Sequence, residues 1–126
     1  MAQKEMLVYV IDDDASVRRA FELLLRSAGF SVQAFASAEA FFENGGPSDN
    51  GVTILDMRMP GMTGLELIKK LASQENRVKV IAVSGYDDAP ARERAGKLGA
   101  VAFFRKPVDD QALIDAIEWA MREEKP

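Results

Sequence analysis

The chain alternates regularly between two hydrophobic periods, and this alternation restricts its possible folds more than any other feature. Five short apolar runs are typical of buried strands: Leu7–Ile11, Ser31–Phe35, Val52–Leu55, Val78–Val83 and Ala100–Phe104. Each is followed by a stretch with helical spacing of its apolar residues. Strands that alternate with helices in this way indicate a parallel sheet covered by helices on both faces.

The helical segments complete the fold prediction. The first is marked by apolar residues at intervals of four, three and four: Val17, Phe21, Leu24 and Ala28. The others are expected at about Ala38–Glu43, Gly64–Ala72, Pro90–Leu98 and Gln111–Arg122. We predict an α/β fold with a doubly wound, five-stranded parallel sheet of flavodoxin-like order 2-1-3-4-5 and five helices. Periodicity alone leaves any other small α/β domain as an alternative.

Composition bounds the class of protein. With 126 residues, 48% hydrophobic and 29% charged, we expect one globular domain over residues 1–126, with an ordered core from about 6 to 122. The chain has no cysteine and no histidine, which excludes disulfides, thiol catalysis, Ser-His triads and histidine-ligated zinc. Its net charge of −4 argues against direct contact with nucleic acid. Because it has neither a membrane-spanning run nor a secretory signal, we expect a cytoplasmic protein without a membrane partner.

Polar residues follow four of the predicted strands where each strand ends. Asp12, Asp13 and Asp14 follow the first, Asp56 the third, Ser84 the fourth, and Lys106 follows the fifth. In an open parallel sheet these ends meet at one edge, where ligands bind. Carboxylates of Asp12, Asp13 and Asp56 in one crevice require cations, which Lys106 and a divalent metal would supply. Hard oxygen ligands favour Mg²⁺ over zinc. The alternative is that these acids are only helix caps and turn residues.

The same residues carry a resemblance to a known family. The segments VYVIDDDASVRR and TILDMRMPGMTG, the serine of VIAVSG and the lysine of FFRKP together resemble the receiver domain of bacterial two-component response regulators. The resemblance extends from about Leu7 to Met121. The segment LDMRMPGMTGLELI and the position of Phe103 are similar to the subfamily that carries a FixJ-like or NarL-like output domain.

The resemblance implies a role for each site residue. Asp56 would be the phosphoacceptor, forming an acyl phosphate, and Lys106 and Ser84 would contact the phosphoryl oxygens. Mg²⁺ would be bound by Asp13, Asp56 and the backbone carbonyl of Arg58, with Asp12 acting through water. Ser84 and Phe103 would form the conformational switch. The Lys106–Pro107 peptide would be cis.

Two residues depart from the more usual family pattern. Arg58, two residues after the phosphoacceptor, is longer than the residue often found there, so it could alter water access to the acyl phosphate. Ser84 replaces the commoner threonine but keeps the hydroxyl group. Three methionines near this segment, Met57, Met59 and Met62, are explained by packing rather than by a ligand.

Two other functions remain open at this point. The run Asp12-Asp13-Asp14-Ala15-Ser16 is similar to the start of haloacid-dehalogenase-type phosphatases, in which Asp12 would be the nucleophile and Asp56 would have no role. A degenerate receiver that only binds partners is the other. The receiver interpretation describes a signalling domain rather than an enzyme, because it catalyses only its own phosphorylation and dephosphorylation.

The resemblance also implies partners. Because the chain has no histidine, its phosphodonor must be a separate histidine kinase or a small phosphodonor. An output domain outside this chain is a further expected partner. In the predicted fifth helix Trp119 lies opposite the expected buried stripe of Leu113, Ile117 and Met121, on a face that carries charged residues of both signs. We therefore expect phosphorylation to promote a homodimer through the surface of the fourth helix, fifth strand and fifth helix.

Overall fold

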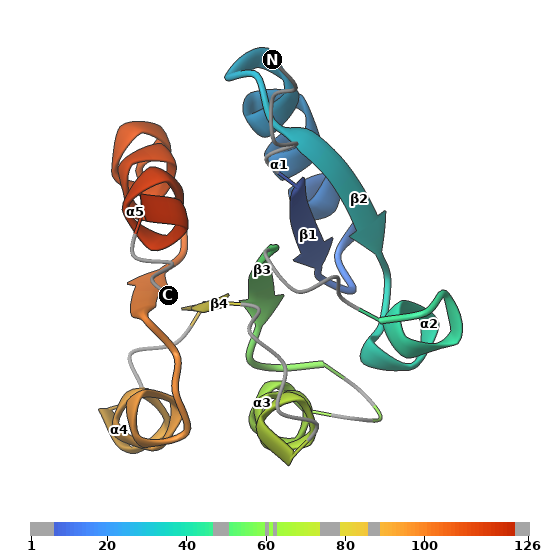
Figure 1. Cartoon of the computed structure of the whole chain (residues 1–126), viewed down its shortest axis with the longest axis vertical. Helices are drawn as coiled ribbons and strands as arrows, with labels where there is room; N and C mark the ends of the chain where they lie inside the picture. The colour runs from blue at the N-terminus through green and yellow to red at the C-terminus, as the bar shows by residue number, and fades with distance from the viewer. Residues whose placement is uncertain are drawn as a thin grey trace.

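The computed structural model of the chain describes residues 7–46, 51–59, 61, 63–73, 79–85 and 89–122. Strands and helices alternate along these residues without exception (Figure 1). The strands are β1 (Leu7–Ile11), β2 (Ser31–Phe35), β3 (Val52–Asp56), β4 (Lys79–Ser84) and β5 (Ala102–Arg105). The helices are α1 (Ala15–Ser27), α2 (Ala38–Glu43), α3 (Gly64–Ser73), α4 (Ala89–Lys97) and α5 (Asp110–Arg122).

The five strands form one parallel sheet in the order β2-β1-β3-β4-β5, which confirms the predicted fold class and strand order. Helices α1 and α5 lie on one face of the sheet, and α2, α3 and α4 lie on the other (Figure 1). Side chains alternate along each strand, so each face has its own apolar core. In β1, for example, Val8 and Val10 pack under α1 and α5, while Tyr9 and Ile11 face α2 and α3.

Small differences at the strand ends bear on the site. Strands β3 and β4 each extend one residue beyond the predicted end, so that Asp56 and Ser84 are the last residues of their strands. Strand β5 starts two residues later than predicted because the N–H of Ala100 donates to the carbonyl of Ala95 and ends α4 instead. The predicted strand start at Val78, the predicted limit at Met6, Met62 of the methionine cluster and the tail 123–126 lie outside the described residues.

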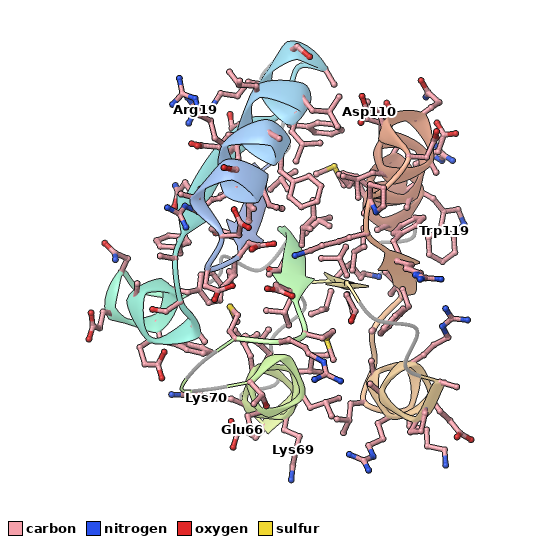
Figure 2. All side chains as sticks on the ribbon, turned by 180° about the vertical axis from the view of Figure 1, so that it is seen from behind. Arg19, Glu66, Lys69, Lys70, Asp110 and Trp119 are labelled. Atoms are coloured by element: carbon pink, nitrogen blue, oxygen red, sulfur yellow. The ribbon has the colours of Figure 1, made fainter. Side chains whose placement is uncertain are left out.

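Helix α5 confirms most of the predicted face. Leu113 and Ile117 are fully buried, but the third buried position is Ala120 rather than Met121, which is half-buried. The small side chain at 120 lies closer to the centre of the contact with the sheet, and the longer Met121 packs at its margin. Trp119 is 44% exposed on the outer side of the helix, as predicted (Figure 2).

The loops after β1 and β3 are fixed by side-chain caps on the helices that follow. Asp14 caps α1 and accepts hydrogen bonds from the N–H groups of Ser16 (2.9 Å) and Val17 (3.2 Å). Thr63 and Glu66 form a reciprocal capping box at the start of α3, with N···O distances of 2.8 and 3.2 Å. Both helices therefore start at defined residues directly beside the carboxyl edge of the sheet. Among the described residues, no helix is long and apolar enough to cross a membrane.

Candidate functional site

The carboxyl edge of the sheet brings together the polar residues singled out in the sequence. Asp12 follows β1, Asp56 ends β3 and Ser84 ends β4, and these three strands are adjacent or one place apart in the sheet. The N–H of Lys106 donates to the carbonyl of Ser84 at 2.7 Å, which fixes the residue after β5 against the end of β4. The Lys106–Pro107 peptide is cis, as expected.

Three carboxylates form an acidic cluster at this edge. Oxygens of Asp12, Asp13 and Asp56, one from each residue, lie within 4.8 Å of one another. Asp12 is 1% exposed and Asp56 is 5% exposed, whereas Asp13 faces solvent. Their mutual repulsion is little screened because two of the three are removed from water. We refer to Asp12, Asp13, Asp56 and Lys106 as the acidic site.

Lys106 supplies the positive charge of the acidic site. Its Nζ donates to Oδ2 of Asp12 at 2.9 Å and lies 3.6 Å from Oδ1 of Asp56. The other oxygen of Asp12, Oδ1, accepts a hydrogen bond from the N–H of Asp14 at 2.9 Å. Both oxygens of the Asp12 carboxylate are thus already engaged within the protein. One lysine against three carboxylates leaves the cluster with excess negative charge.

The burial of Asp56 changes its acidity. Loss of solvation raises the pKa of Asp56 from 3.8 to about 6, because the charged form is poorly solvated at this position. The N–H of Arg58, which donates to Oδ1 at 3.2 Å, works against this rise, as does Lys106, while the nearby Asp12 and Asp13 add to it. Near neutral pH the ionised form of Asp56 is therefore less favourable in the folded protein than in water.

The pKa of Lys106 is also raised, but for a different reason. Burial by itself would lower the pKa of Lys106, but the hydrogen bond with Asp12 and the charge of Asp56 outweigh it and raise the pKa above 10.5. Lys106 stays protonated over the whole physiological range. Its contribution to stability is present below pH 10.5 and is lost as the pH rises above that value.

The donor set of the acidic site fits Mg²⁺. All three candidate ligands are carboxylate oxygens, which hard divalent cations prefer. With Mg–O distances of about 2.1 Å, two oxygens on opposite sides of an octahedral ion are about 4.2 Å apart, and adjacent ones are closer. Oxygens that already lie within 4.8 Å of one another need only small movements to reach this geometry.

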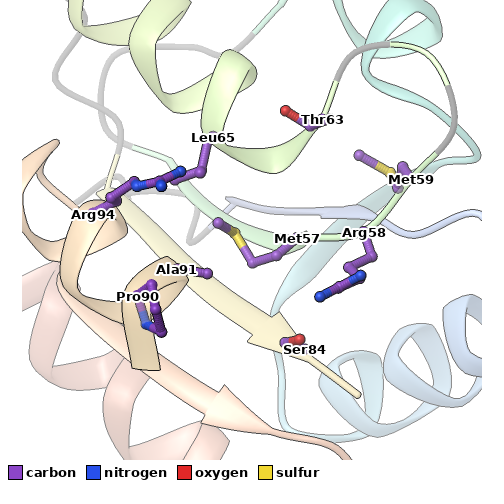
Figure 3. A pocket seen from close by; sticks show the side chains of 9 residues that line it. All are labelled: Met57, Arg58, Met59, Thr63, Leu65, Ser84, Pro90, Ala91 and Arg94. Atoms are coloured by element: carbon purple, nitrogen blue, oxygen red, sulfur yellow. The ribbon is translucent and has the colours of Figure 1, made fainter. Parts of the chain in front are cut away.

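The remaining predicted residues lie around the cluster. Ser84 is 1% exposed and belongs to the sheet face that α2, α3 and α4 cover. Phe103 is half-buried on β5, paired in register with Ala82, and packs against the core of the same face. Arg58 contributes its N–H to Asp56 and lines a cavity near Ser84 (Figure 3).

The loop that follows Asp56 depends on one glycine. A Cβ atom at Gly64 would lie 2.7 Å from the Cα of Met57 and 3.1 Å from the carbonyl oxygen of Asp56, closer than ordinary van der Waals contact. Met57 and Met59 are buried at 7% and 6% exposure, which confirms for these two that the methionines serve packing. Gly64 therefore lets the start of α3 pack directly on the backbone of the strand end.

Sequence reasoning missed Gly64 and also Arg18. The Nη1 of Arg18 donates to the backbone carbonyl of Asp12 at 2.9 Å and so ties the first turn of α1 to the end of β1. The sequence shows Arg18 only as one of several arginines on the polar face of a helix, with no signal that separates it from its neighbours. Gly64 appears in the sequence only as the first residue of a predicted helix, because its close approach to Met57 depends on the tertiary fold.

Comparisons with known proteins agree with this geometry. A family model of the response regulator receiver domain matches residues 8–118. The transcriptional regulatory protein FixJ of Azorhizobium caulinodans is 46% identical over 110 residues, which cover 87% of this chain and 52% of FixJ. The response regulator protein TmoT of Ectopseudomonas mendocina is 40% identical over 122 residues, which cover 97% of this chain and 56% of TmoT.

The solved structures show the same fold. A crystal structure of FixJ-N superposes with a TM-score of 0.87 at 36% identity, covering 98% of this chain and 99% of that chain. The present chain spans about half the length of the curated relatives it matches.

Proposed function

This chain belongs to the response regulator receiver domain family of two-component signalling, and on that premise we propose that Asp56 accepts a phosphoryl group from a histidine kinase. Receiver domains are signalling proteins rather than classical enzymes, and this chain would catalyse only its own phosphorylation and dephosphorylation. The observation that carries the proposal is the convergence of Asp12, Asp13 and Lys106 on the buried Asp56 carboxylate.

In the proposed reaction an Asp56 oxygen attacks phosphorus. The new O–P bond forms as the N–P bond of a phosphohistidine breaks, and the electron pair of that bond leaves with the imidazole nitrogen, which takes up a proton. Lys106 stays protonated, lies 3.6 Å from Asp56 and can move from Asp12 to a phosphoryl oxygen. The hydroxyl of Ser84 can donate to a second phosphoryl oxygen. These groups supply positioning and charge neutralisation, which phosphoryl transfer requires most.

We propose Mg²⁺ as the cofactor, bound by Asp13, Asp56 and the backbone carbonyl of Arg58, with Asp12 acting through water. When bound, the ion would neutralise charge on the phosphoryl oxygens. The structure supports an indirect role for Asp12, because both of its oxygens already accept hydrogen bonds. Solvent-facing Asp13 is the carboxylate best placed to take a ligand directly.

The phosphatase alternative, in which Asp12 is the nucleophile, is disfavoured. Membership of the receiver family leaves Asp12 outside the acceptor position, and its carboxylate is 1% exposed and held on both oxygens. A degenerate receiver that binds partners without phosphorylation would have the same fold but would not be labelled by a phosphodonor. One labelling experiment therefore distinguishes the three proposed functions.

We further propose the cellular setting. The unit would be a single cytoplasmic receiver domain with its core from about 6 to 122, coupled to an output domain of the kind that relatives such as full-length FixJ carry. Phosphorylation would alter the surface of α4, β5 and α5 through Ser84 and Phe103 and promote self-association there. We propose no direct contact with nucleic acid or membrane for this domain.

The experiment is incubation with acetyl phosphate and Mg²⁺, followed by mass measurement of the intact protein. One phosphoryl group should be added to the wild type and none to Asp56→Asn. Asp13→Ala should lose most of the Mg²⁺ affinity and slow labelling severely. A covalent label that survives Asp56→Asn but disappears in Asp12→Asn would instead support the phosphatase. Absence of any label in the wild type would support the degenerate receiver.

A further inference from the structure

An arginine of α4 covers the ring of the proposed switch residue. The guanidinium carbon of Arg92 lies 5.2 Å from the centroid of the Phe103 ring, within the range of a cation–π contact. Arg92 is exposed and Phe103 is half-buried, so the contact joins the outer surface of α4 to the edge of the core. Nothing in the sequence pattern singles out Arg92 among the basic residues of α4.

A cavity lies on the same face of the sheet as this ring. It has a volume of about 550 Å³ and is lined by residues of the loop after β3, of α3, β4 and α4, among them Met57, Ser84 and Ala91 (Figure 3). Phe103 pairs in register with Ala82, two residues before Ser84, so its side chain and that of Ser84 project from the same face. Phe103 itself is not among the lining residues, but Ser84 of the neighbouring strand and Ala91, next to Arg92 in α4, are.

The cavity can take an aromatic ring. An apolar cavity of about 150 Å³ already holds a benzene molecule, and this one is larger and lined mainly by apolar side chains. The Phe103 ring therefore has two environments within reach: its present one under Arg92, and one nearer Ser84. Two packings of one side chain that differ by a small free energy are what a switch requires.

We propose that Arg92 is a positioning residue that holds the Phe103 ring in its present place and opposes its movement toward Ser84. This inference rests on the proposed function, because the movement matters only if Asp56 is phosphorylated. Arg92 thus adds to the free energy that phosphorylation must supply before the Phe103 ring moves.

The size of the effect follows from the strength of such contacts. An exposed cation–π pair contributes enough free energy to change an equilibrium about two- to fivefold. Removal of the guanidinium should shift the Phe103 equilibrium by this factor toward the inner position. By linkage, a ligand that favours the inner position should bind more tightly by at most the same factor.

The test uses beryllofluoride with Mg²⁺ as a mimic of the phosphoryl group, with bound beryllofluoride measured by ¹⁹F NMR. Arg92→Gln should lower the concentration for half-saturation about two- to fivefold. Arg92→Lys, which keeps a cation without the planar group, should restore most of the wild-type value. Lys97→Gln is the matched control, because Lys97 is an exposed basic residue of the same helix that does not line the cavity. No aromatic contact of Lys97 is seen among the described residues, so this variant should leave the value unchanged.

A second measurement follows the ring itself. With 4-fluorophenylalanine in place of phenylalanine, the Phe103 signal is assigned by its loss in Phe103→Leu. In unliganded Arg92→Gln this signal should lie part of the way toward its beryllofluoride-bound position, which a merely local loss of contact would not produce. Equal half-saturation values for Arg92→Gln and Lys97→Gln, with an unmoved signal, would overturn the inference and leave the proposed function intact. A wild type that binds no more beryllofluoride than Asp56→Asn would refute both.

Discussion

The buried carboxylate of Asp56 should destabilise the metal-free protein, and its removal should make the fold more stable. Asp56→Asn keeps the shape of the side chain and one oxygen that can accept the hydrogen bond from the N–H of Arg58. The substitution removes the negative charge of a residue that is 5% exposed and lies close to Asp12 and Asp13. Lys106 retains its 2.9 Å contact with Asp12 in the variant.

The pKa gives both the magnitude and the pH window. The pKa of Asp56 is about 6 in the folded protein against an ordinary value of 3.8, so the folded state binds this proton more tightly than the unfolded state. Stability is therefore lost as the pH rises from about 4 to 6, and the loss is complete above about pH 7. At 1.36 kcal/mol per pKa unit, the difference corresponds to about 3 kcal/mol. Burial of the new amide N–H groups offsets roughly 1–2 kcal/mol, so we expect a net gain of about 1–2 kcal/mol at pH 7.5.

The assay is urea unfolding in EDTA from pH 4 to pH 8. The difference in unfolding free energy between Asp56→Asn and wild type should be near zero at pH 4 and reach its plateau by pH 7. Asp115→Asn is the control, because Asp115 is an exposed residue of α5. The side-chain oxygen of the new asparagine can still accept the hydrogen bond that Gln111 donates to Asp115. Added Mg²⁺ should stabilise the wild type more than Asp56→Asn. A variant no more stable than wild type at pH 7.5, or a gain that does not depend on pH, would refute the reasoning.

Three further predictions concern packing, charge and surface. Gly64→Ala should lower the free energy of unfolding by about 1–3 kcal/mol and slow labelling by acetyl phosphate, because the added Cβ would collide with the backbone at the end of β3. The control is Gly96→Ala in α4, where a Cβ meets open space, and this variant should be neutral or slightly stabilising. Lys106→Met should lower stability in EDTA by about 1–3 kcal/mol by leaving buried acids without their cation, and Mg²⁺ should restore more of that loss than it adds to wild type. A soluble quencher should reach Trp119 in dilute unmodified protein, and beryllofluoride should protect its fluorescence increasingly as the protein concentration, and with it dimer formation, rises. Protection already present in the dilute unmodified monomer would contradict the exposed position of Trp119 and its role in the dimer contact.

The fold could be predicted from sequence because its determinants are local and repeated. Strand β1 and strand β2 match their predicted bounds, as does the short helix α2, since each apolar run is closed by polar or capping residues. The exposure of Trp119 followed from the rotation of 100° per residue in a helix. The helical rotation did not predict that Ala120 rather than Met121 is the third buried residue, because this depends on how deeply each position lies against the sheet.

The acidic site was predictable for a different reason. Asp12, Asp56 and Lys106 follow strands, and the topology of a parallel sheet alone brings strand ends together. The contacts that refine the site come instead from helices packed on the sheet. Arg18 reaches the Asp12 carbonyl across a turn of backbone, and Arg92 reaches Phe103 from α4; both look like ordinary charged residues on a solvated helix face until the helices are docked.

The charges that strain the acidic site also explain how it could transmit a signal. Lys106 is held by Asp12 on its side chain and by the Ser84 carbonyl on its backbone, so it connects the carboxylates to the end of β4. A phosphoryl group on Asp56 would add negative charge beside a lysine that stays protonated, and we expect Nζ to move from Asp12 toward it. Phe103 lies on β5, three residues before Lys106, which directly follows that strand, and its ring contacts Arg92 of α4. A shift of Lys106 would therefore act directly on the strand that carries Phe103.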